Sequence, residues 1–105
     1  MRKKAINALL EMGMPVNLLG FKYIVDAMVL LEDEDWNNCK ITSLYFKIAK
    51  MNNTTYQRVE RCIRHAFGNV LKKGDLVFVQ KWLTLNNTTS GNLLYTFHMK
   101  LAEGK

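Results

Sequence analysis

The sequence lacks the features that define several large classes of protein. Its 105 residues include one proline and two cysteines, and no run reaches the roughly 18 uninterrupted apolar residues that a membrane-spanning helix requires. The basic start, M-R-K-K-A-I-N, is not followed by the apolar segment and cleavage site of a signal peptide. Cys39 and Cys62 are too few for a disulfide framework. We therefore expect one cytoplasmic domain over residues 1–105, away from membranes.

Patterns of catalysis and metal binding are also missing. The acidic run at residues 32–35 lacks the alternating oxygen ligands, central glycine and closing glutamate of an EF-hand. The cysteines and histidines (Cys39, Cys62, His65 and His98) do not have zinc-finger spacing. Nothing points to a residue that would orient a Cys62–His65 pair for nucleophilic catalysis. There is neither a glycine-rich phosphate loop nor a catalytic carboxylate pair. We expect no enzyme activity, no metal and no cofactor.

Acidic residues are scarce in the middle of the chain. The formal net charge is +6, and residues 36–74 alone carry +7, against −2 before them and +1 after them. Glu60 is the one acidic residue in that middle segment. A polyanion such as nucleic acid is the natural partner of such a segment, although basic patches also bind membranes and proteins.

The first third of the chain predicts two helices. Apolar residues recur at near-helical spacing over residues 2–13, and Gly13 and Pro15 mark the end of that helix. A second helix is predicted from Gly20 to about Glu34. Because it is the most apolar helix of the chain, we expect it to cross the core.

Residues 41–67 predict two helices joined by a tight polar turn. Thr42 or Ser43 is suited to cap the first helix, which should run to about Met51. Asn52-Asn53 then interrupts the helical period. Asparagine tolerates the left-handed backbone that a tight turn between helices needs.

The second helix of this pair should occupy about residues 54–73. Thr54 is expected to cap it, with Gln57 completing a capping box, and Gly74 to end it. At about 100° per residue, one arc of the helix holds its apolar residues: Val59, Cys62, Ile63, Ala66, Phe67 and Val70. The opposite arc holds Gln57, Arg61 and Arg64, flanked by Arg58, Glu60 and His65. Such a two-faced helix after a tight turn is typical of a recognition helix that enters the major groove of DNA.

The polar side chains of this region divide into two sets. We assign base contacts to Gln57, Glu60, Arg61 and Arg64. The planar fork of arginine matches two acceptors on guanine, for about 1–3 kcal/mol of discrimination, whereas Glu60 is suited either to accept from a cytosine amino group or to orient an arginine. Phosphate contacts, which position without specifying sequence, are assigned to Lys47, Lys50, Arg58, His65, Lys72 and Lys73. The simpler alternative is that these are ordinary solvated charges.

The last third of the chain allows two interpretations. Residues 76–83 are rich in β-branched and aromatic side chains, and with the turn-like residues 86–92 and a run from Leu93 to Leu101 they could form a β-hairpin. That hairpin would be the wing of a winged helix. The other interpretation has Asp75 capping a short helix to about Leu83, followed by a loop and a helix over about residues 92–103.

A resemblance to a known family runs from about residue 6 to Asp75. Its most specific stretch is N-T-T-Y-Q-R-V-E-R-C-I-R-H-A-F, residues 53–67, which is similar to the family's pattern around V-E-R-x-I-R-H-A. The segments M-G-M-P-V-N-L-L-G-F-K-Y-I at 12–24 and I-A-K at 48–50 match as well. The chain thus resembles the C-terminal DNA-binding effector domain of the master sporulation response regulator of spore-forming bacteria, the stage 0 sporulation protein A family.

The resemblance implies a compact all-α bundle of about six helices with a central helix-turn-helix, which favours helices after Gly74. It implies sequence-specific binding of double-stranded DNA at a TGTCGAA-type element, often as head-to-tail pairs of domains. It also implies regulation of transcription connected to sporulation, with contacts to RNA polymerase. The positions that match the family's DNA-contacting residues are Glu60, Arg61, Arg64 and His65.

Two departures from the family accompany the resemblance. The family's phosphoacceptor receiver domain is not found within these residues, and Thr89-Ser90-Gly91-Asn92 stands where the family has a Pro-Thr-Asn-type entry to its last helix. An alternative function is therefore a protein-interaction module that pairs with a full-length sporulation regulator and modulates it. Its contact face would come from the apolar C-terminal third (Phe78, Trp82, Leu93, Leu94, Tyr95 and Phe97).

Overall fold

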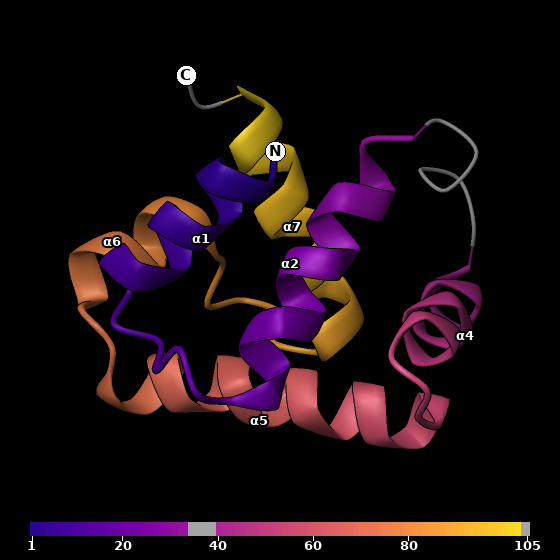
Figure 1. The fold of residues 1–105 in the computed structure, drawn as a ribbon. Helices are drawn as coiled ribbons and strands as arrows, with labels where there is room; N and C mark the ends of the chain where they lie inside the picture. The colour runs from indigo at the N-terminus through magenta and orange to yellow at the C-terminus, as the bar shows by residue number, and fades with distance from the viewer. Residues whose placement is uncertain (34–39, 104–105) are drawn as a thin grey trace.

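The computed structural model describes residues 1–33 and 40–103, and within these ranges the chain folds into helices without a β-strand (Figure 1). The helices are α1 (Arg2–Glu11), α2 (Leu19–Leu31), α4 (Ile41–Met51), α5 (Tyr56–Lys73), α6 (Leu76–Trp82) and α7 (Ser90–Glu103). The predicted all-α fold is therefore confirmed. The winged-helix alternative is wrong, because the residues of its proposed hairpin lie in α6 and α7.

The helices gather on one side of α5. In Figure 1, α5 runs along the lower edge, α2 stands across its middle, and α4 lies over its N-terminal end. The predicted course of α2 through the core is confirmed, although the helix ends at Leu31 rather than near Glu34. The expectations that concern Glu34, Asp35 and Cys39 lie outside the described residues.

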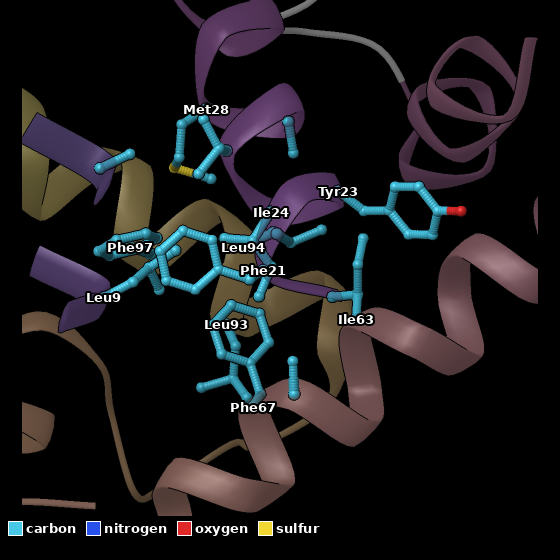
Figure 2. Packing of buried hydrophobic residues seen from close by; sticks show 14 of the residues in the cluster. Leu9, Phe21, Tyr23, Ile24, Met28, Ile63, Phe67, Leu93, Leu94 and Phe97 are labelled. Atoms are coloured by element: carbon cyan, nitrogen blue, oxygen red, sulfur yellow. The ribbon is translucent and has the colours of Figure 1, made fainter. Parts of the chain in front are cut away.

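The core lies between α2, α5 and α7. Figure 2 shows apolar side chains from the three helices meeting there: Phe21, Ile24 and Met28 from α2, Ile63 and Phe67 from α5, and Leu93, Leu94 and Phe97 from α7. Along α2 and α5 these side chains recur at intervals of three or four residues, and on α7 Leu93 and Leu94 lie four and three residues before Phe97, so each helix buries one stripe. Burying a side chain of this size stabilises the fold by about 1.5–3 kcal/mol, and the three stripes together hold α5 in place.

The C-terminal third becomes helical because its caps and packing override its β-propensity. Asp75 caps α6, as the helical interpretation predicted, and its Oδ1 accepts from the Val77 amide at 3.1 Å. Val79 and Leu83, four residues apart, are both buried. The apolar residues of α7 are buried as well: Leu93, Leu94, Phe97 and Leu101. Leu93, Leu94 and Phe97 were predicted to belong to the contact face of the protein-interaction module. Because all three are buried, that predicted contact face is wrong.

Two glycines allow backbone arrangements that other residues would not. Gly13 follows the end of α1 with φ +88°, which confirms its predicted place at the end of that helix. Gly20 is buried where α2 crosses α5, and a β-carbon there would overlap the carbonyl oxygen of Cys62 and the side chain of Ala66. The close approach of α2 to α5 therefore depends on Gly20. None of the described helices is long and apolar enough to cross a membrane.

Candidate nucleic-acid interface

The turn between α4 and α5 has the predicted left-handed residue but different caps. Asn53 has φ +54°. The cap of α5 is Thr55, whose Oγ1 accepts from the Arg58 amide at 3.3 Å. The predicted cap at Thr54, with its capping box to Gln57, is wrong, because the Thr54 amide still bonds to the Ala49 carbonyl at 2.9 Å and belongs to the turn.

The start of α4 also differs from the prediction. Helix α4 begins at Ile41, with Lys40 in the cap position and no side-chain cap hydrogen bond. Thr42 and Ser43 therefore lie inside the first turn, where neither caps the helix. The result is a helix-turn-helix whose second helix begins at Tyr56 and ends at Lys73, close to the predicted residues 54–73.

A buried carboxylate on α2 fixes the turn. Asp26 is 4% exposed, and its Oδ2 accepts from Asn52 Nδ2 at 3.0 Å. The same Asn52 nitrogen donates to the Ile48 carbonyl at 2.8 Å, and Lys22 donates to the Asn52 side-chain oxygen. Lys22 Nζ also lies 3.6 Å from Asp26 Oδ2. Sequence analysis missed this contact, although an acidic residue within the most apolar helix was its available signal.

Helix α5 separates its two faces as predicted. Val59, Ile63, Ala66, Phe67 and Val70 are buried against α2, α4 and α7. Gln57, Arg61 and Arg64 are exposed and succeed one another at intervals of four and three residues. A row at this spacing follows one line along the helix. We call these three residues the reading row. Cys62, expected on the packing arc, is only partly buried.

The reading row leads to a hollow that four basic side chains surround. Gly68 lies four residues beyond Arg64 and continues the line of the row. No neighbouring atom lies within 4 Å of the place where its β-carbon would be. The hollow is lined by Arg64, His65, Gly68, Asn69, Lys72 and Lys73. Four of the predicted DNA contacts, three of them phosphate contacts, are thus brought together.

Glu60 takes part in a hydrogen-bonded chain beside the reading row. Ser90, the first residue of α7, donates to Glu60 Oε2 at 3.1 Å, and the Tyr45 hydroxyl lies 2.8 Å from the Ser90 oxygen. The Ser90 hydroxyl has a single proton, which it donates to Glu60, so the Tyr45 hydroxyl is the donor to Ser90. Burial raises the pKa of Tyr45. Arg64 Nε lies 3.8 Å from the same oxygen of Glu60. Of the two roles considered for Glu60, orienting an arginine agrees with these contacts.

The remaining predicted phosphate contacts lie toward the N-terminal end of α5. Lys50 and Arg58 are exposed, and Lys47 is partly buried on α4. Lys50 and Gln57 border a second hollow, whose apolar walls are Phe46 and Tyr56. Sequence analysis assigned no role to either aromatic residue. Within residues 1–33 and 40–103, no three His, Cys, Asp or Glu side chains gather into a group that could hold a metal ion.

One comparison with known proteins bears on this surface. The family model described as "Sporulation initiation factor Spo0A C terminal" matches residues 5–94. The matched range includes both helices of the helix-turn-helix, the reading row and the hollow at Gly68.

Proposed function

The chain belongs to the family of the sporulation initiation factor Spo0A C-terminal domain, a family of DNA-binding regulatory domains rather than of enzymes, and we propose that it binds double-stranded DNA sequence-specifically through α5. The main support for this proposal is the exposure of the three polar side chains of the reading row. Gln57, Arg61 and Arg64 are exposed on α5. In Figure 1 the lower side of α5 is not covered by another described helix. A helix of this kind fits the major groove of B-DNA.

The polar groups of the row suit the edges of bases in that groove. Arg61 and Arg64 each present a planar set of donors that matches the two acceptors of guanine, and Gln57 suits the donor and acceptor of adenine. Arg64 is held near Glu60, which is itself bonded to Ser90. A side chain that is oriented before binding loses less conformational freedom on contact with DNA. We therefore keep Gln57, Glu60, Arg61 and Arg64 as the residues that determine sequence preference, with Glu60 acting through Arg64.

The hollow at Gly68 suits the sugar-phosphate backbone. The absence of a side chain at Gly68 leaves room between Arg64 and Lys72, and the surrounding cations would neutralise a phosphate group. Arg58, Lys47 and Lys50 would contact phosphates near the other end of α5. These contacts set the position of the protein on DNA, and they supply most of the salt dependence of binding.

The proposed DNA target and the proposed assembly on DNA are taken from the family resemblance. The proposed element is of the TGTCGAA type, and the proposed assembly is a pair of copies arranged head to tail on DNA. Regulation of sporulation genes, with a contact to RNA polymerase, completes the proposal. In the rival proposal, a protein-interaction module, the chain would pair with a full-length sporulation regulator and would not need the exposed arginines of the reading row.

Methylation interference tests the proposal. Methylation of guanine at N7 blocks one of the two acceptors that an arginine fork uses in the major groove. We expect methylated guanines of a TGTCGAA-containing duplex to be depleted from the bound fraction, and the depletion at one guanine to disappear in Arg61→Ala. A bound fraction in which methylated guanines are as frequent as in free DNA would contradict major-groove recognition. Absence of any DNA complex would favour the interaction module.

A further inference from the structure

Two aromatic residues form an apolar pair at the N-terminal end of α5. Phe46 belongs to α4, and Tyr56 is the first residue of α5. Their ring centroids are 4.5 Å apart, and the ring planes meet at 41°. The Phe46 side chain is 58% exposed. The two rings wall a hollow whose rim includes Thr54, Lys50 and Gln57.

The packing of the described residues, 1–33 and 40–103, does not explain the exposure of Phe46. The inner side of α4 is formed by Leu44, Ile48 and Ala49, which are buried, so Phe46 adds little to the core. A scattered exposed apolar residue is ordinary on a protein surface. This one, however, is in tilted contact with a second aromatic ring beside Lys50 and Gln57, the first residue of the reading row.

The place of the pair in the helix-turn-helix indicates what could fill the hollow. The N-terminal residues of a recognition helix contact the edges of bases. Gln57, which borders the hollow, is the first member of the reading row, and Lys50, which also lines the hollow, supplies a positive charge. The hollow is therefore continuous with the proposed DNA interface, and its occupant would lie in the major groove next to the base that faces Gln57.

We propose that the Phe46–Tyr56 pair forms an apolar site for the C5-methyl group of a thymine. Among the four bases, thymine alone presents a methyl group in the major groove, and apolar side chains recognise it there. This inference rests on the proposed function, because it needs α5 in the major groove. It adds a means of recognition that the polar reading row lacks, since arginine and glutamine read only hydrogen-bonding groups.

Uracil provides the test, because it differs from thymine only by the missing methyl group and forms the same base pair. Each thymine of a TGTCGAA-containing duplex and its flanks is replaced singly by deoxyuridine, and dissociation constants are measured by fluorescence anisotropy. Burying one methyl group corresponds to about a fourfold change in affinity. We expect one replacement to weaken binding of the unaltered protein by about fourfold, and the others to leave it unchanged.

Three variants connect that effect to the aromatic pair. Phe46→Ala should lose the difference between thymine and uracil at that position, whereas Tyr56→Phe keeps the ring and should retain it. Leu10→Ala, a truncation of another exposed apolar residue on α1, should also retain it. Thermal unfolding of each variant confirms that it is folded before its affinity is interpreted.

The outcomes separate this inference from the proposed function. Sequence-specific binding with no sensitivity to any thymine-to-uracil replacement would overturn the inference and leave the proposed function standing. A methyl effect that persists undiminished in folded Phe46→Ala would also overturn the inference. Equal binding to TGTCGAA-containing and scrambled duplexes would overturn both.

Discussion

The Ser90 hydroxyl, at the start of α7, donates to Glu60 Oε2 on α5 at a distance of 3.1 Å. Through Glu60 this contact reaches Arg64, whose Nε lies 3.8 Å from the same oxygen. Tyr45 of α4 joins the chain on the other side of Ser90. Side chains from α4, α5 and α7 are thus connected through Ser90 and Glu60, beside the exposed Arg64.

Removal of the Ser90 hydroxyl tests this connection. Ser90→Ala should lower the free energy of unfolding by about 1 kcal/mol, because a partly buried carboxylate loses a hydrogen-bond donor. It should also weaken binding to specific DNA more than binding to random DNA, because Arg64 is less well positioned. Urea unfolding and anisotropy titration measure the two effects. Ser43→Ala, on the exposed part of α4, is the control, and equal effects from both variants would contradict the connection.

Arg61→Ala should reduce the preference for the specific element. Loss of a bidentate contact to guanine costs about 1–3 kcal/mol at one base pair. Competition titrations with duplexes that vary at single positions would locate the affected base. Arg58→Ala, which removes a charge assigned to phosphate contact, should weaken specific and random DNA to the same degree. If Arg61→Ala also weakened binding to specific and random DNA equally, the proposal that Arg61 contacts a base would be contradicted.

Lys72→Ala should weaken binding to all sequences alike. One fewer phosphate contact flattens the plot of log affinity against log salt concentration by about one unit of slope. Titrations over a series of potassium chloride concentrations give this slope. Lys3→Ala, on the exposed side of α1, removes the same charge from another surface and should leave the slope unchanged. If Lys72→Ala behaved like Lys3→Ala, Lys72 would no longer count as a phosphate contact.

Gly68→Ala and Gly20→Ala should have opposite effects on stability. Alanine at Gly68 meets no neighbouring atom, so the free energy of unfolding should rise by about 0.5–1 kcal/mol through better helix propensity. Alanine at Gly20 would overlap the backbone of α5, and the free energy of unfolding should fall by about 1–3 kcal/mol. Urea unfolding of both variants checks the pair. Stabilisation of both would mean that α2 does not need its close approach to α5.

His98 should make the protein less stable in mild acid. Burial lowers its pKa below the ordinary value of 6.5, with a smaller opposing effect from Glu32, and its Nε2 has no hydrogen-bond partner among the described residues. Between the lowered pKa and 6.5, the unfolded chain binds more protons than the folded protein, so the free energy of unfolding falls as the pH drops through that range. His98→Gln should flatten this part of the pH profile. If the unaltered protein and His98→Gln had the same dependence of stability on pH, the acid sensitivity could not be assigned to His98.

Helix α5 could be predicted because its signals are local. Its apolar arc and its row of Gln57, Arg61 and Arg64 repeat at helical spacing, and Asn53 and Gly74 mark its limits. The cap of α5 is Thr55 rather than the predicted Thr54, because the left-handed turn at Asn53 holds Thr54 against the end of α4. Over residues 76–83 the β-propensity of single residues competed with an Asp75 cap and buried positions four apart. From that pattern alone, helix and hairpin could not be distinguished.

The contacts that orient the interface could not be predicted, because they join residues far apart in sequence. Ser90 and Glu60 are 30 positions apart, and Asn52 and Asp26 are 26 apart. No periodicity relates such pairs, and each becomes visible only when the helices are packed. The Phe46–Tyr56 pair was missed for a similar reason, since its rings come from two helices and meet across the turn.

The central claim, sequence-specific recognition by α5, is tested most directly by a single titration. Binding of the unaltered protein to a TGTCGAA-containing duplex and to a scrambled duplex of the same composition is measured at two salt concentrations. We predict tighter binding to the TGTCGAA duplex at both concentrations, with the affinities for both duplexes falling as salt increases. Equal affinities for the two duplexes, or no binding to either, would contradict the claim.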